Sequence, residues 1–130
     1  MNNCPDSCQR IGVMVVKDKM IMGKKIVYIA HPIGGDVDNN VKKVLAIIRE
    51  LNLSGLPIVP FAPYIVDVLA LDDSDPEQRK RGFENNKQLF QLIDEVWLYG
   101  DRISIGMNEE IGWAIQLGIN VVSKSEGTRS

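Results

Sequence analysis

Short apolar runs of the kind that form buried strands alternate along this chain with segments whose apolar residues recur every three or four positions. The first pattern indicates strands, and the second indicates helices with one buried face. Strands joined by helical crossovers lie parallel, so the alternation predicts a three-layer, Rossmann-like (flavodoxin-like) α/β domain with a mainly parallel sheet of four to five strands. The expected strands are 24–31, 56–61, 94–100 and 119–123, and the expected helices are 36–51, 63–71, one ending near 93, and 107–117.

The length of 130 residues is enough for one sizeable core. We assign residues 23–124 to this domain, 1–22 to an N-terminal extension that is either disordered or an edge strand, and 125–130 to a C-terminal tail. A net charge of -2 excludes the concentrated basic face that general binding to the phosphates of nucleic acid requires. No apolar run reaches the roughly 18 residues that a membrane span needs.

The two cysteines, Cys4 and Cys8, both lie in the polar start of the chain. No second Cys or His pair accompanies them to complete a metal site, and the start lacks the pattern of a secretory signal. We therefore expect reduced thiols, a cytoplasmic protein and no bound metal.

Ligands of parallel α/β sheets bind outside the carboxyl ends of the strands, and here the segments HPIGGD, FAP and GDRISIGMNEE follow three strands. Glu110 is expected in the first turn of the last helix, at the flank of an apolar side formed by Met107, Ile111, Ala114, Ile115 and Gly118, with Glu109 solvated. The helix dipole would hold Glu110 ionised there. It is then either a nucleophile or base, or an acidic residue that merely stabilises a helix start.

Asn85 and Asn86 are expected on the inward side of the preceding helix, where buried amides need hydrogen-bond partners. They form either a ligand site or a tie to a neighbouring loop. Gly34 and Gly35 make either a simple turn or a close approach to a phosphate at a helix start. His31, the single histidine, is either a hydrogen-bonded structural residue or a ligand-binding one.

Three motifs in order carry a family resemblance: YIAHPIGG from Tyr28, DEVW from Asp94, and S-x-G-x-x-x-E-I-x-x-A-x-x-x-G-I-x-V from Ser104. Together they resemble the nucleoside 2-deoxyribosyltransferase superfamily, most closely its small bacterial and phage branch with a G-M-x-x-E-I helix. The resemblance covers residues 24–124.

The resemblance implies N-glycosidic chemistry on a nucleoside or nucleoside 5′-monophosphate, without a cofactor. The carboxylate of Glu110 would attack C1′, the base would leave, and water or a second base would resolve the glycosyl-enzyme. Tyr28 would orient the carboxylate, and Ser104 with the Gly34–Gly35 turn would hold the sugar 5′ end or its phosphate. The expected substrate-binding residues are His31, Gly34, Gly35, Ser104, Gly106 and Met107.

One departure concerns the position where the family usually places an Asp that handles the proton on the leaving base. Asn86 stands there and cannot supply a titratable proton, so another acid such as Glu84 or Asp67 would have to act. The alternatives are a non-catalytic protein that binds a nucleotide or a nucleotide-derived signal, or a scaffold whose pocket has closed. The resemblance also implies a homo-oligomer.

Overall fold

A computed structural model describes residues 23–124 of the chain, and the extension and tail predicted for 1–22 and 125–130 lie outside the described residues. The described strands form one sheet in the order β3-β2-β4-β5, and every neighbouring pair is parallel. The predicted α/β fold with a parallel sheet is confirmed, with four strands in this part of the chain. The strands are β2 (Lys25–Ala30), β3 (Ile58–Phe61), β4 (Glu95–Leu98) and β5 (Asn120–Ser123).

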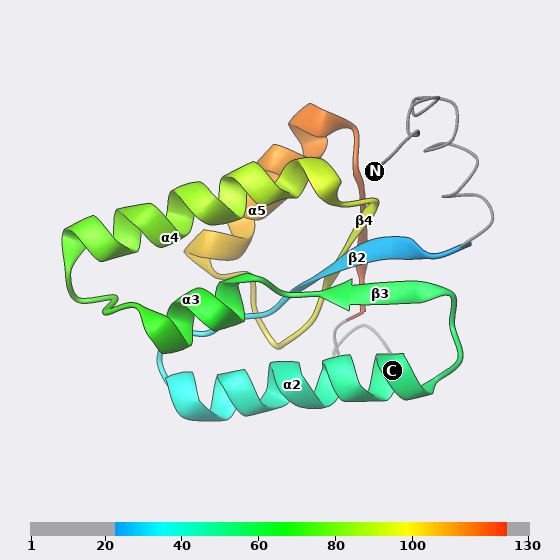
Figure 1. The fold of residues 1–130 in the computed structure, drawn as a ribbon, viewed down its shortest axis with the longest axis horizontal. Helices are drawn as coiled ribbons and strands as arrows, with labels where there is room; N and C mark the ends of the chain where they lie inside the picture. The colour runs from blue at the N-terminus through cyan, green and yellow to red at the C-terminus, as the bar shows by residue number, and fades with distance from the viewer. Residues whose placement is uncertain (1–22, 125–130) are drawn as a thin grey trace, which may run out of the picture.

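Helices cover both faces of the sheet, with α2 on one face and α4 and α5 on the other (Figure 1). Alternate side chains of β2 reach both layers, since Val27 and Ile29 pack towards α2 whereas Tyr28 and Ala30 pack towards α4 and α5. This explains why the strand is a continuous apolar run. The helical elements are α2 (Val37–Leu53), α3 (Tyr64–Ala70), α4 (Pro76–Leu89), the 3-10 turn η1 (Phe90–Leu92) and α5 (Ile105–Leu117). None of these helices is long and apolar enough to cross a membrane.

The inward side of α5 differs from the predicted one. Ile115 is 71% exposed, whereas Trp113 is buried. The reason is that Trp113 packs edge-on against Phe90, which turns the helix so that its buried side is centred between Trp113 and Met107. At about 100° per residue, Glu110 falls in the middle of that side and not at its flank.

The prediction of which residues of α4 face inward is also partly wrong. Asn86 is buried as expected, but Asn85 is exposed, and so is Leu92. The helix ends at Leu89 and the chain continues as a 3-10 turn, which winds more tightly. The helical period therefore does not run unbroken from Leu92 back to Asn85, and only one of the two amides reaches the core.

The chain leaves the two central strands in opposite directions, since β2 leads through α2 to β3 and β4 leads through α5 to β5. Such a switch point opens a crevice at the carboxyl edge of the sheet. The loops after β2 and β4 meet beside it, where a Cβ atom added to Gly100 would lie 2.5 Å from Cδ of Pro32. Gly100 also has a φ of 97°, so both its backbone conformation and its surroundings require glycine.

This close approach makes Gly100→Ala a test of the loop geometry. We expect the variant to lower the free energy of unfolding by about 1–3 kcal/mol, measured by urea denaturation, because it adds backbone strain and a clash. The matched control is Gly112→Ala in α5, where nothing lies within 4 Å of an added Cβ atom. That variant should instead stabilise the protein by about 0.5–1 kcal/mol through helix propensity. A Gly100→Ala protein as stable as the wild type would contradict the close approach.

Candidate active site

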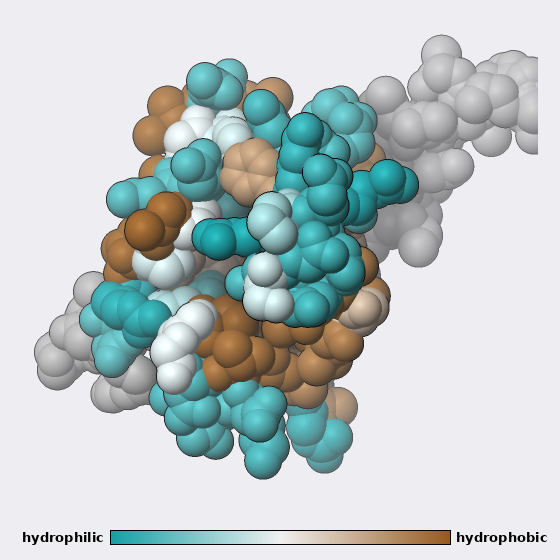
Figure 2. Space-filling view, turned by 90° about the vertical axis from the view of Figure 1, so that its left-hand side faces the viewer, coloured by the Kyte–Doolittle hydropathy of each residue, from teal (hydrophilic) through white to brown (hydrophobic). Residues whose placement is uncertain are grey.

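A cleft of about 800 Å³ opens at the carboxyl edge of the sheet, with walls from the loop after β2, from α3 and α4, and from the loop and first turns of α5. Figure 2 looks onto this side of the molecule and shows it hollowed between polar and apolar side chains. The size falls in the range of small-molecule sites. Most of the predicted site residues line the cleft, namely His31, Gly34, Asn86, Ser104, Gly106, Met107 and Glu110. Gly35 is exposed and is not among the lining residues.

The three predicted catalytic positions meet in one hydrogen-bonded cluster, although they come from β2, α4 and α5. The hydroxyl of Tyr28 donates to Oε2 of Glu110 at 2.5 Å. The amide of Asn86 donates to the same Oε2 at 3.1 Å and to the Tyr28 hydroxyl at 2.9 Å. These three hydrogen bonds fix Oε2 of Glu110. Within the described residues, no hydrogen bond reaches the other carboxylate oxygen, Oε1.

The carboxyl group of Glu110 is held where its charge is costly. Burial raises its pKa from the usual value to about 7, and the hydrogen bonds from Tyr28 and Asn86 act in the opposite direction. The prediction that the helix dipole holds Glu110 ionised is therefore wrong. The helix begins at Ile105, so Glu110 lies in its second turn, beyond the free N–H groups, and burial decides its protonation.

Two tyrosines beside this carboxyl group stay protonated. Burial, followed by the negative charge of Glu110, raises the pKa of both Tyr28 and Tyr64 well above the ordinary value. Tyr28 therefore acts as a donor to Glu110. Tyr64 donates its hydroxyl hydrogen to the carbonyl of Ile29 at 2.6 Å and is one of the residues that line the cleft.

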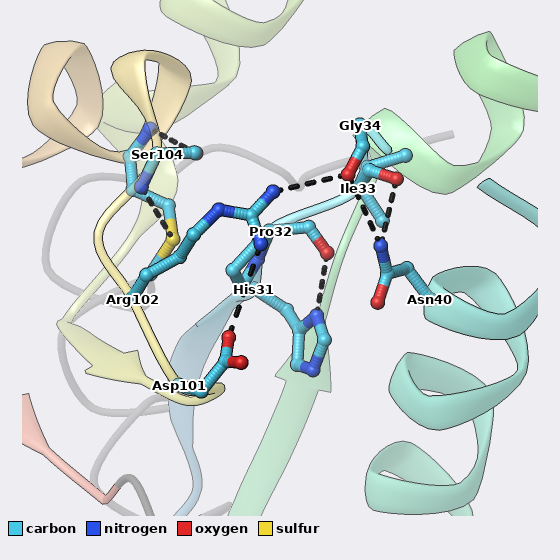
Figure 3. A network of polar contacts seen from close by, with 9 residues as sticks. His31, Pro32, Ile33, Gly34, Asn40, Asp101, Arg102 and Ser104 are labelled. Atoms are coloured by element: carbon cyan, nitrogen blue, oxygen red, sulfur yellow. Dashed lines mark hydrogen bonds and ion pairs between the residues drawn. The ribbon is translucent and has the colours of Figure 1, made fainter. Parts of the chain in front are cut away.

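The two loops that flank the cleft are tied together by polar contacts, which Figure 3 shows from close by. Nη2 of Arg102, from the loop after β4, donates to the carbonyl of Gly34 in the loop after β2 at 3.0 Å. Nδ2 of Asn40 donates to the carbonyl of Ile33 at 2.8 Å. Nδ1 of His31 lies 2.6 Å from the carbonyl of Pro32, which assigns the hydrogen of a neutral ring to Nδ1. The turn thus has its carbonyl groups bound by side chains of the protein.

Side-chain caps position α2 and α5, two of the helices that begin at this edge. The hydroxyl of Ser104 accepts from the backbone N–H of Met107 at 3.2 Å, so Ser104 caps α5 as well as lining the cleft. Asp36 caps α2 by accepting from the side chain of Asn39 at 2.8 Å and from its backbone N–H at 3.4 Å. A carboxylate therefore already occupies the start of α2, beside the Gly34–Gly35 turn.

Several lining residues were not among the predicted site residues. Tyr64 follows the FAP segment that the sheet-edge rule singled out, and Arg102 lies inside the GDRISIGMNEE segment, so the rule marked their neighbourhoods without selecting them. Arg79 and Phe83 come from α4, which no sheet-edge argument reaches. Of the two acids considered in place of Asn86, Asp67 lines the cleft, whereas Glu84 is exposed and does not.

These features define a Rossmann-like α/β domain with a buried carboxyl group at the mouth of its sheet. The chain matches the family described as a domain of unknown function (DUF7768) over residues 25–124, and it belongs to this family. No curated protein matches the chain. Within residues 23–124, no three His, Cys, Asp or Glu side chains are grouped to hold a metal ion.

The raised pKa of Glu110 links its ionisation to folding. The unfolded chain releases this proton near pH 4.5 and the folded chain near pH 7, so ionisation costs the fold stability as pH rises through this interval. Glu110→Gln mimics the protonated acid and avoids that cost. We expect the variant to match the wild type near pH 4.5 and to exceed its free energy of unfolding by on the order of 1–3 kcal/mol at pH 8, measured by urea denaturation. An equal difference at both pH values would contradict the raised pKa.

A second prediction concerns the donor to Glu110. Tyr28→Phe removes a hydrogen bond that favours the carboxylate, so the pKa of Glu110 should rise further above about 7, by on the order of one unit. Carboxyl ¹³C NMR titration measures it. Tyr64→Phe makes the same chemical change at a ring 5.6 Å away that donates to Ile29 instead, and should leave the pKa nearly unchanged. Equal shifts in the two variants would argue against the Tyr28 hydrogen bond.

Proposed function

We propose that this protein cleaves the N-glycosidic bond of a nucleoside or nucleoside 5′-monophosphate, either hydrolysing it or transferring the deoxyribosyl group to another base. The observation that carries the proposal is the Glu110 carboxyl group, oriented by Tyr28 and Asn86 at the wall of an open cleft. A carboxylate fixed through one oxygen is suited to attack through the other. The motif resemblance of Tyr28, Ser104 and Glu110 to nucleoside 2-deoxyribosyltransferases supplies the substrate class.

The proposed reaction has two steps. Oε1 of ionised Glu110 forms a bond to C1′ while the bond from C1′ to the base nitrogen breaks, and the electron pair leaves with the base. Oε2 becomes the carbonyl oxygen of the resulting ester and keeps its hydrogen bonds from Tyr28 and Asn86. Water or a ring nitrogen of a second base then attacks C1′, the bond from C1′ to Oε1 breaks, and Glu110 leaves as the carboxylate. The proton of the attacking water or base passes to the departed base or to solvent, and the product is a free sugar or a new nucleoside. With a pKa of about 7, Glu110 is about half ionised at neutral pH.

The cleft offers groups for each part of such a substrate. The rings of Tyr64 and Phe83 line it and can pack against a base, since aromatic rings favour stacked or edge contacts. Ser104 keeps its hydroxyl hydrogen available to donate, because its oxygen acts as the acceptor in the helix cap. Arg79 is exposed and lines the cleft, so its guanidinium group is available to a phosphate there.

One observation favours a second function, binding of a nucleotide without chemistry. Both hydrogens of the Asn86 amide are engaged within the cluster, and an amide has no proton to give a departing base. Calorimetric titration of nucleosides and 5′-monophosphates separates the two functions, since tight binding of a ligand that is recovered unaltered favours the binding protein. The expected homo-oligomer and cytoplasmic location stay predictions.

The test is to incubate the protein with a panel of nucleosides, 2′-deoxynucleosides and 5′-monophosphates and to separate free bases by chromatography. We expect base release that increases with pH through about 7, as Glu110 ionises. Glu110→Gln should lose at least about 1,000-fold in kcat, because it removes the nucleophile. Glu84→Gln is the matched control, since Glu84 is exposed and does not line the cleft, and it should retain wild-type activity. No base release from any substrate, or full activity of Glu110→Gln, would overturn the proposal.

A further inference from the structure

We propose that the preferred substrates of this cleft are N-glycosides whose base is already a cation, so that the base leaves neutral and needs no proton. Pyridinium nucleosides and N7-alkylated purine nucleosides have this chemistry. The inference rests on the proposed N-glycosidic function and narrows its substrate class.

The first argument is the absence of an acid among the groups that contact the nucleophile. Glu110 receives hydrogen bonds from a phenol and an amide. The Tyr28 phenol is fully buried and its hydrogen is committed to Glu110, and the amide of Asn86 has no titratable proton. The other carboxyl groups that line the cleft, Asp67, Asp73 and Glu109, make no hydrogen bond to this cluster. A neutral base would therefore have to leave without a proton donor from the cluster.

The second argument is the charge of the cleft. Among the described residues that line it, four carry carboxyl groups, at positions 67, 73, 109 and 110, and two carry guanidinium groups, at positions 79 and 102. Arg102 is already bound to the carbonyl of Gly34 at 3.0 Å and lies 3.8 Å from Asp101. Carboxyl groups thus outnumber free cations, and a cleft of this sign attracts a positively charged ligand.

The third argument is the aromatic lining. Phe83 is 46% exposed, and Trp113 fixes its ring edge-on at 5.2 Å between centroids. Tyr64 contributes a second ring, fixed by its hydrogen bond to Ile29. The faces of such rings attract cations, so a positively charged heteroaromatic base gains more from them than a neutral base of the same shape.

A cationic base makes the proposed first step complete without proton transfer. Oε1 of Glu110 bonds to C1′, the bond between C1′ and the cationic ring nitrogen breaks, and its electron pair neutralises the charge on that nitrogen. The base departs as a neutral heterocycle. Water then adds its oxygen to C1′, Glu110 leaves as the carboxylate, and the proton of the water passes to solvent. The positive charge also favours the ionised form of Glu110 while the substrate is bound.

The experiment compares matched pairs of substrates at pH 6. 7-Methylguanosine and guanosine differ by one methyl group and one positive charge, and nicotinamide riboside is compared with uridine as a pair with single-ring bases. Blanks without enzyme and with Glu110→Gln correct for spontaneous hydrolysis. An enzymatic acid typically contributes about 100-fold or more, so we expect kcat/KM to favour at least one cation over its neutral partner by about 100-fold. Calorimetry with Glu110→Gln should also show tighter binding of that cation.

A ratio of tenfold or more in either pair supports the inference. Ratios below tenfold in both pairs, with base release from neutral nucleosides that Glu110→Gln abolishes, would overturn it and leave the proposed function standing. Base release from neither the cations nor the wider panel would overturn the proposed function together with the inference.

Discussion

The hydrogen bond from Tyr28 to Glu110 is the contact on which the site depends. Tyr28 lies in the central strand β2 and is fully buried, with its ring 4.7 Å from Phe90 and 5.6 Å from Tyr64 between centroids. A side chain packed on all sides has little freedom to move, so its hydroxyl is a fixed point in the core. The carboxyl group of Glu110 and the amide of Asn86 take their positions from that point, which sets the geometry of the cluster before any ligand arrives.

The cleft exists because the two central strands send the chain in opposite directions. The loops that leave β2 and β4 then approach one another at Pro32 and Gly100, and Arg102 joins them through the carbonyl of Gly34. These contacts keep the mouth of the sheet in one shape, while the open side between α3, α4 and α5 remains accessible. A rigid edge with one open wall is what a small-molecule site requires.

The protein keeps an acidic group where ionisation is unfavourable, although a glutamine would fill the same space with less cost at neutral pH. Functional groups are commonly held in such positions, because a pKa near neutrality lets a carboxyl group exchange its proton under working conditions. Among the described residues, the other buried polar side chains are His31 and Asn86, and both are hydrogen-bonded within the protein, whereas the clusters around β2 are apolar or aromatic, so the cost of a buried ionisable group is confined to one side chain. Glu110 and the other carboxyl groups that line the cleft all add negative charge to the site when they are ionised.

The alternation of apolar runs and helical spacing determined the fold class from the sequence alone. Strands of a parallel sheet are buried on both faces, so each one is a continuous apolar run that can be recognised in the sequence. The motifs likewise identified Tyr28, Asn86 and Glu110 as candidate catalytic positions, and in the structure hydrogen bonds connect these three side chains.

Predictions from local sequence patterns failed where packing between helices and strands decided which side of a helix is buried. The 3-10 turn after α4 put Asn85 in solvent, and the contact of Trp113 with Phe90 turned α5. That rotation, together with a helix start at Ile105, placed Glu110 on the inward side of α5, half-buried at the wall of the cleft, and not in an exposed first turn. Only the tertiary structure could decide its protonation, because desolvation depends on which side chains from distant segments exclude water from it, and residue order along one helix does not contain that information.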